Sequence, residues 1–225
     1  MSGLLAWYRA DRGITLDTGV SAWASQAGSE GLPLVQATPI RQPTWSSTGW
    51  GGALPAVKTD GLDDFLLTSA LALDPDNFVI AGAMQWVSAT NTCAAGLGSP
   101  TDNSTASLVA SSAAAGYALI RSSAGGNRVT GLTVAATTTA RGLWVLNCAG
   151  ATATLTVRGT AGTVNKTVPF VSGASDYSRC CVGALYRIGL ANNFAAANVS
   201  EVIVASAVTD ITALLDDMES RWPLS

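Results

Sequence analysis

Residues 141–160, "RGLWVLNCAGATATLTVRGT", indicate two β-strands joined by a turn. In the second strand small and branched apolar residues alternate with polar ones, which gives an apolar face of Ala153, Leu155 and Val157 and a polar face of Thr152, Thr154, Thr156 and Arg158. A period of two is typical of an antiparallel strand with one face in a core. Gly150 and Ala151 separate the two runs, so we expect a hairpin.

Similar short runs, separated by Gly, Ser, Asn and Pro, occur along most of the chain. They are "LLAWY" (4–8), "NFVIAGAMQWV" (77–87), "GYALIRS" (116–122), "NRVTGLTV" (127–134), "CCVGALY" (180–186) and "VSEVIVAS" (199–206). Gly125-Gly126 predicts a tight turn between the third and the fourth run. Residues 99–115 are rich in Ser, Ala and Thr, and they fit either a long loop or strands with small side chains.

Helical periodicity is clear at the C-terminal end, over about residues 210–222. The apolar residues fall at the spacing of one helix face: Ile211, Leu214, Leu215, Met218 and Trp222. Thr209 or Asp210 can cap the start, and Pro223 follows the end. The polar face is acidic, which argues against a membrane-surface helix. We expect one domain, residues 1–225, with an all-β fold: a two-sheet antiparallel β-sandwich of the jelly-roll type with a C-terminal α-helix.

Composition excludes several classes of function. Of the 225 residues 48% are hydrophobic and 12% are charged, the net charge is −3, and the arginines are scattered singly. Nucleic-acid binding is therefore not expected. The apolar runs are about half the length of a membrane span, so no membrane insertion is expected. The start of the chain shows no signal peptide, which predicts synthesis in the cytoplasm.

The residue types needed for several catalytic mechanisms are missing. The chain has no histidine, which excludes Ser-His-Asp and Cys-His catalysis. The cysteines show no C-x-x-C spacing and are expected to be reduced and structural: Cys93, Cys148, Cys180 and Cys181. Neither Glu30, Glu201 nor Glu219 begins the E-x-D-x-x-E strand of sandwich-fold glycoside hydrolases. We therefore expect a protein that is not an enzyme, and glycoside hydrolysis ranks last among its functions.

Six short motifs, in order, resemble a known family. They are "LLAWYRAD" (4–11), "VSAWAS" (20–25), "RQPTW" (41–45), "GALPAVKTDGLDDFL" (52–66), "VSEVIVAS" (199–206) and "MESRW" (218–222). The chain resembles laminin-G-like, concanavalin A-like jelly-roll domains of the bacterial and phage type. Lys58-Thr59 and Ala196-Ala197 depart from the family pattern. The resemblance implies a β-sandwich and a tendency toward binding roles, without fixing a ligand.

Three acidic residues, Asp60, Asp63 and Asp64, lie within five positions of one another in "VKTDGLDDFLLT" (57–68). One interpretation is a turn between two strands, with Gly61 adopting a positive φ and the aspartates accepting hydrogen bonds from nearby backbone N–H groups. The other is a calcium site, since carboxylate oxygens are the ligands that Ca²⁺ prefers. We favour the turn, and no other cofactor is expected.

Trp45 and Trp50, in "TWSSTGWGG" (44–52), are the candidate sugar-binding residues because they lie in an apparent loop that contains several glycines. The favoured function is a structural or decoration component, for instance of a phage particle. Its partners would be other protein subunits, among them copies of itself, and its location the virion surface. The alternative is a carbohydrate-binding lectin or adhesin that recognises a cell-surface glycan.

Overall fold

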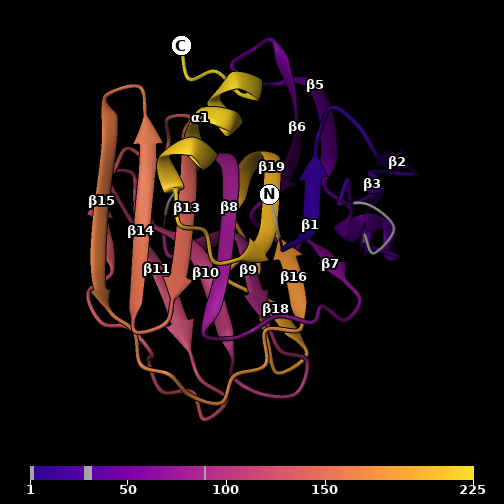
Figure 1. Ribbon diagram of the computed structural model, residues 1–225. Helices are drawn as coiled ribbons and strands as arrows, with labels where there is room; N and C mark the ends of the chain where they lie inside the picture. Colours follow the sequence, from indigo (N-terminus) through magenta and orange to yellow (C-terminus); the bar gives the residue numbers. More distant parts are fainter. Residues whose placement is uncertain (1–2, 28–31, 89) are drawn as a thin grey trace.

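The computed structural model describes residues 3–27, 32–88 and 90–225, so Glu30 lies outside the described residues. Two large antiparallel β-sheets face each other, and a C-terminal helix lies across the outer face of one of them (Figure 1). This arrangement confirms the predicted two-sheet β-sandwich with a terminal α-helix.

The first sheet has eight strands. Its path runs β15 (Gly162–Pro169), β14 (Thr152–Gly159), β13 (Gly142–Ala149), β8 (Asn77–Trp86), β19 (Ala196–Ser206), β6 (Leu54–Asp60) and β5 (Thr44–Trp50), while β1 (Leu4–Arg9) pairs with β19. β6 pairs with the beginning of β19 and β1 with its end.

The second sheet has nine strands. Its order is β12 (Thr133–Ala135), β11 (Ala115–Arg121), β10 (Thr105–Ser112), β9 (Thr92–Gly98), β16 (Arg179–Val182), β7 (Leu66–Thr68), β4 (Leu34–Val35), β3 (Val20–Trp23) and β2 (Ile14–Leu16). A short hairpin, β17 (Leu185–Arg187) with β18 (Leu190–Asn192), lies over β9 on the face that points away from the core. A 3-10 turn, η2 (Pro39–Arg41), precedes β5.

The hairpin of residues 141–160 forms as its alternation predicts. β13 and β14 pair from Gly142 with Gly159 to Ala149 with Thr152. The apolar face of β14, which is Ala153, Leu155 and Val157, is buried in the core between the two sheets. The alternation therefore located both the strand and its inner face.

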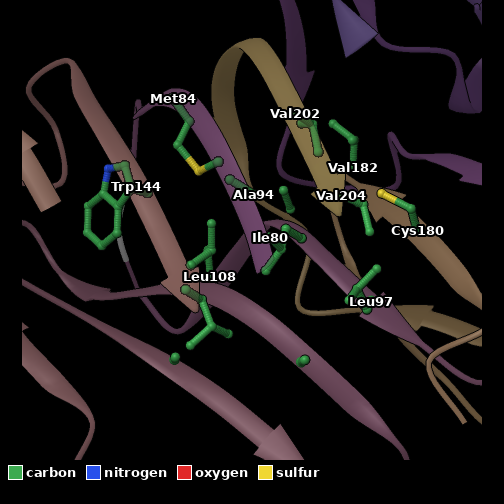
Figure 2. Packing of buried hydrophobic residues seen from close by; sticks show 14 of the residues in the cluster. Ile80, Met84, Ala94, Leu97, Leu108, Trp144, Cys180, Val182, Val202 and Val204 are labelled. Atoms are coloured by element: carbon green, nitrogen blue, oxygen red, sulfur yellow. The ribbon is translucent and has the colours of Figure 1, made fainter. Parts of the chain in front are cut away.

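β8 is buried on both faces, because it is central in its sheet. Phe78, Ile80 and Met84 point into the core between the sheets, where Figure 2 shows Ile80 and Met84 among side chains of the facing strands. Val79 and Ala81 lie on the opposite face, beneath the helix. A strand covered on both sides reads as a continuous apolar run, as this one does.

Residues 99–115, which the sequence left as either a loop or strands, contain one strand and the first residue of another. β10 is the third strand from one edge of the nine-stranded sheet, with Ala106, Leu108 and Ala110 directed into the core. Its polar positions, Thr105 and Ser107, are also buried, and their hydroxyl groups bond to each other at 2.9 Å. Small side chains on both faces allow other elements to approach this strand closely.

The terminal helix, α1 (Ile211–Arg221), begins at the predicted cap. The Asp210 side chain accepts a 2.9 Å hydrogen bond from the backbone N–H of Ala213. Leu214, Leu215 and Met218 pack on the outer face of the eight-stranded sheet. Within the described residues, no helix is both long and apolar enough to span a bilayer.

Two of the places where the strand prediction was incomplete have a clear physical reason. In "NRVTGLTV" only the last residues form a strand, β12, and residues 127–132 run beside β11 as an irregular segment. Here the guanidinium of buried Arg128 bonds to Tyr177 and Asp76, so this side chain serves a polar network instead of a sheet face. The edge strand β15 was not predicted, because its residues are exposed on both faces and show no apolar pattern.

Candidate functional site

The three aspartates meet at the corner where the chain leaves one sheet for the other. β6, which ends at Asp60, belongs to the eight-stranded sheet, and β7 belongs to the nine-stranded sheet. Gly61 has a φ of +82°, and the backbone N–H of Leu62 donates to Asp60 Oδ1 at 2.8 Å. The backbone N–H of Asp60 donates to Asp64 Oδ2 at 3.1 Å. These contacts are those of the predicted turn, in which aspartate side chains satisfy nearby backbone donors.

The corner concentrates negative charge. One carboxylate oxygen from each of Asp60, Asp63 and Asp64 lies within 4.8 Å of the others. Asp64 is 7% exposed, and its burial, together with the charges of Asp60 and Asp63, raises its pKa to about 6. Among the described residues one cationic side chain lies within 4 Å of these carboxylates, that of Arg41, whose Nε is 3.8 Å from Asp63 Oδ2. Chemically, this arrangement could bind a divalent cation or a cationic partner, and it also serves as a turn.

Trp45 lies on β5, the strand that pairs with β6, three ladder positions from Asp60. Its partner in the sheet is Val57, and the residue is 38% exposed. The indole Nε1 donates a 2.8 Å hydrogen bond to the backbone oxygen of Ala10, at the end of β1. The ring is therefore fixed in orientation while part of its surface faces solvent, as stacking against a sugar requires.

The structure corrects the prediction that Trp50 is a loop residue available for sugar binding. This residue does not lie in a loop: both tryptophans belong to β5, and Trp50 is 1% exposed. Its ring makes an edge contact with Trp222 (centroids 6.5 Å apart), and its Nε1 donates to the backbone oxygen of Pro223 at 3.1 Å. Trp50 packs beneath α1, whereas Trp45 pairs with Val57 of the inter-sheet core, so the two rings do not form one platform.

The two glutamates that the structure describes and two aspartates of α1 are engaged in ion pairs. Glu201 is fully buried and accepts hydrogen bonds from Trp7 Nε1 at 2.7 Å and Arg221 Nε at 2.9 Å. Glu219 and Asp216 both pair with Arg158, at 3.0 and 2.6 Å. Sequence reasoning missed the Glu201 cluster, because its three members come from β1, β19 and α1 and have no common pattern.

All four cysteines are free and buried, as predicted. Burial raises the pKa of the Cys93 and Cys180 thiols to about 12. Since the thiolate is the reactive form, the environment disfavours nucleophilic or metal-binding chemistry at these positions.

No protein-family model and no curated protein matches this sequence. Solved structures do share the fold. Domain 4 of AbnA, a GH43 extracellular arabinanase from Geobacillus stearothermophilus, in complex with arabinotriose, has a TM-score of 0.58 at 11% identity, over 92% of this chain and 94% of that one. A Trypanosoma rangeli sialidase in complex with sialic acid has a TM-score of 0.59 at 13% identity, over 100% of this chain and 34% of that one. A chain of botulinum neurotoxin type C, whose cell entry is dependent upon interaction with two ganglioside molecules, has a TM-score of 0.60 at 10% identity, over 96% of this chain and 51% of that one.

These similarities show the fold. The chain spans about a third of the sialidase and about half of the neurotoxin chain, so their activities do not transfer to it. A jelly-roll-like sandwich is confirmed, whereas the narrower laminin-G-like family is not. The expectation that the chain is not an enzyme was wrong, because the same fold occurs within glycoside hydrolases. The missing histidine excludes particular mechanisms and leaves catalysis as such open. A structural role in a phage particle is not confirmed and remains a prediction.

Proposed function

We propose that this chain is a carbohydrate-binding β-sandwich module and that the exposed face of Trp45 is its stacking surface. The observation that carries the proposal is the Trp45 ring itself, which is partly exposed and held by its bond to the Ala10 oxygen. A ring that is already fixed loses little conformational entropy when a ligand binds, so more of the contact energy contributes to affinity.

A pair of charged side chains joins the segment that leads into β5 to the aspartate corner. Arg41 is four residues before Trp45 in the sequence and its Nε lies 3.8 Å from Asp63 Oδ2, so the pair offers a donor and an acceptor for sugar hydroxyl groups. A few fixed polar groups beside an apolar surface are the usual composition of a small-molecule site. The fold adds support, because a similar domain has been solved with arabinotriose and a similar toxin depends on gangliosides.

The test is a glycan-array screen of the purified protein, run once in millimolar calcium and once in EDTA. We expect saturable binding in both conditions. Trp45→Ala should weaken that binding at least about tenfold, whereas Trp45→Phe should retain much of it because the ring remains. Val171→Ala, at an exposed apolar residue elsewhere, is the matched control.

The two conditions separate the alternatives. Binding that disappears in EDTA and in Asp63→Asn would assign a calcium site to the three aspartates, as one of the two interpretations of the sequence holds. Binding that is unchanged in Trp45→Ala would place the sugar elsewhere. A folded protein that binds no glycan in either condition would count against the carbohydrate-binding function.

A further inference from the structure

The β17–β18 hairpin turns at an unusual residue. Ile188 has a φ of +53° and Gly189 a φ of +69°, which together define a two-residue turn with both central residues in the left-handed region. Asn-Gly is the common choice at such a turn, and a β-branched residue there is a genuine outlier. Ile188 gains no compensating burial within the chain, because it is 50% exposed.

The hairpin tip is anchored by a backbone hydrogen bond and carries both apolar and positive groups. The backbone N–H of Ile188 donates to the Asp102 oxygen at 2.9 Å, which anchors the tip to the loop before β10. Leu190 is 66% exposed. Arg187 has no acidic partner within 4 Å among the residues that the structure describes. We call Arg187, Ile188 and Leu190 the hairpin tip.

The aspartate corner has the complementary character. Ile40 and Leu62 are the most exposed of the large apolar residues described, at 79% and 76%. They directly adjoin Arg41 and Asp63, the two members of the ion pair at this corner. Three carboxylates against one guanidinium leave the corner with an excess of negative charge. We call Ile40, Leu62 and the three aspartates the acidic corner.

The hairpin connects these two surfaces. Gly183, just before β17, packs so closely on Asp64 that a Cβ there would lie 2.7 Å from the Asp64 backbone oxygen. From this point β17 runs over the nine-stranded sheet, with the Tyr186 oxygen against Gly98, to the tip at Ile188. The acidic corner and the hairpin tip are therefore at the two ends of one short element.

We propose that the partner of both surfaces is a second copy of this chain, docked so that the hairpin tip of each copy meets the acidic corner of the other. A two-fold axis between the two surfaces satisfies both contacts at once and closes the assembly as a dimer. Ile188 and Leu190 then cover Ile40 and Leu62, and Arg187 meets the surplus carboxylates. The contact area is small, so the dimer forms in the micromolar range or above.

The test is sedimentation velocity of the full chain, without any glycan, from micromolar to near-millimolar concentration. We expect a monomer–dimer equilibrium. Arg187→Glu and Asp63→Lys should each weaken it about tenfold or more through like-charge contacts, and the double variant should recover a large part of the loss.

A second variant separates docking from folding. Ile188→Asn places a residue that tolerates positive φ at the turn, so the thermal midpoint should stay the same or rise while dimerisation weakens. Val171→Asn, at an exposed apolar residue away from both surfaces, should leave dimerisation unchanged. A chain that is monomeric at every concentration would overturn the proposal. So would a dimer whose dissociation constant is unaffected by Arg187→Glu and by Ile188→Asn.

Discussion

Two regions of the molecule contain the same kinds of residue and use them in different ways. The helix seam, between α1 and the eight-stranded sheet, contains Trp50, Glu201 and Arg221. The acidic corner contains three aspartates at the end of β6, the strand that pairs with the strand of Trp45. In the seam the glutamate is fully buried, and Trp7 and Arg221 donate to it. At the corner the carboxylates face one another, with one arginine nearby.

The difference shows which surroundings allow a buried carboxylate to stabilise the fold. Burial raises the pKa of Glu201, and the hydrogen bonds from Arg221 and Trp7 oppose that shift. At the corner, burial and the neighbouring carboxylates both raise the pKa of Asp64. The seam therefore stabilises the fold through opposite charges, whereas the corner retains charge that an external partner can neutralise.

The largest expected contrast is between the two tryptophans of β5. Trp50→Ala should cost about 3–5 kcal/mol of unfolding free energy, because it leaves a cavity between α1 and the sheet. Trp45→Ala should cost about 1–2 kcal/mol, because part of the ring is already exposed and one hydrogen bond is lost. Urea unfolding of both variants measures the difference, and equal losses would contradict the assignment of the two rings to different regions.

The next contrast is between two ion pairs of α1. Glu201→Ala should destabilise by about 3 kcal/mol, since it leaves the guanidinium of Arg221 and the indole N–H of Trp7 without their shared acceptor. Asp216→Ala breaks an ion pair in which the aspartate is 65% exposed, and it should cost less than about 1 kcal/mol. Chemical denaturation compares the two. A loss for Glu201→Ala as small as that for Asp216→Ala would mean that the buried cluster does not hold the helix.

The sequence predicted those parts that depend on neighbours along the chain. The alternation of residues 152–158 placed the inner face of β14, and the helix spacing placed α1 with Asp210 as its cap. The turn at Asp60-Gly61 likewise follows from local chemistry, a positive φ at glycine and an aspartate that accepts from Leu62.

What depends on distant partners was not predictable. The strand that carries both tryptophans was missed because it contains Ser46, Thr48 and Gly49, which are typical of loops. The register of β5 on β6 also shifts between Ser46 and Trp50. The position of the Trp50 side chain depends on that shift and on its hydrogen bond to the Pro223 oxygen, 173 positions away. The cluster around Glu201 includes the bond between Trp7 and Glu201, which are 194 positions apart. No local pattern in a single sequence reports such contacts.

A smaller effect concerns the pH dependence of stability at the corner. The pKa of Asp64 is raised to about 6 in the folded chain, above the value of about 4 in an unfolded one, so the folded protein binds this proton more tightly. The resulting stabilisation is fully present below about pH 4 and is lost as the pH rises through about 6. After allowance for solvent screening, we expect about 1 kcal/mol.

Asp64→Asn isolates this pH-dependent stabilisation, because it removes one titrating group and leaves the others. The unfolding free energy of the wild type relative to Asp64→Asn should fall between pH 4 and pH 7. Parallel pH profiles for the two proteins would show that Asp64 titrates normally.

The smallest expected effect is that of calcium on the acidic corner. Two of the aspartates already accept hydrogen bonds from the backbone, Asp60 from Leu62 and Asp64 from Asp60, and Arg41 lies beside the third. Ca²⁺ takes six to eight oxygen ligands, and it would have to compete with all of these contacts. We therefore expect the thermal midpoint to be the same in EDTA and in millimolar calcium. A midpoint that rises with calcium in the wild type but not in Asp63→Asn would show that the corner is a metal site, and the turn would then be the scaffold for that site.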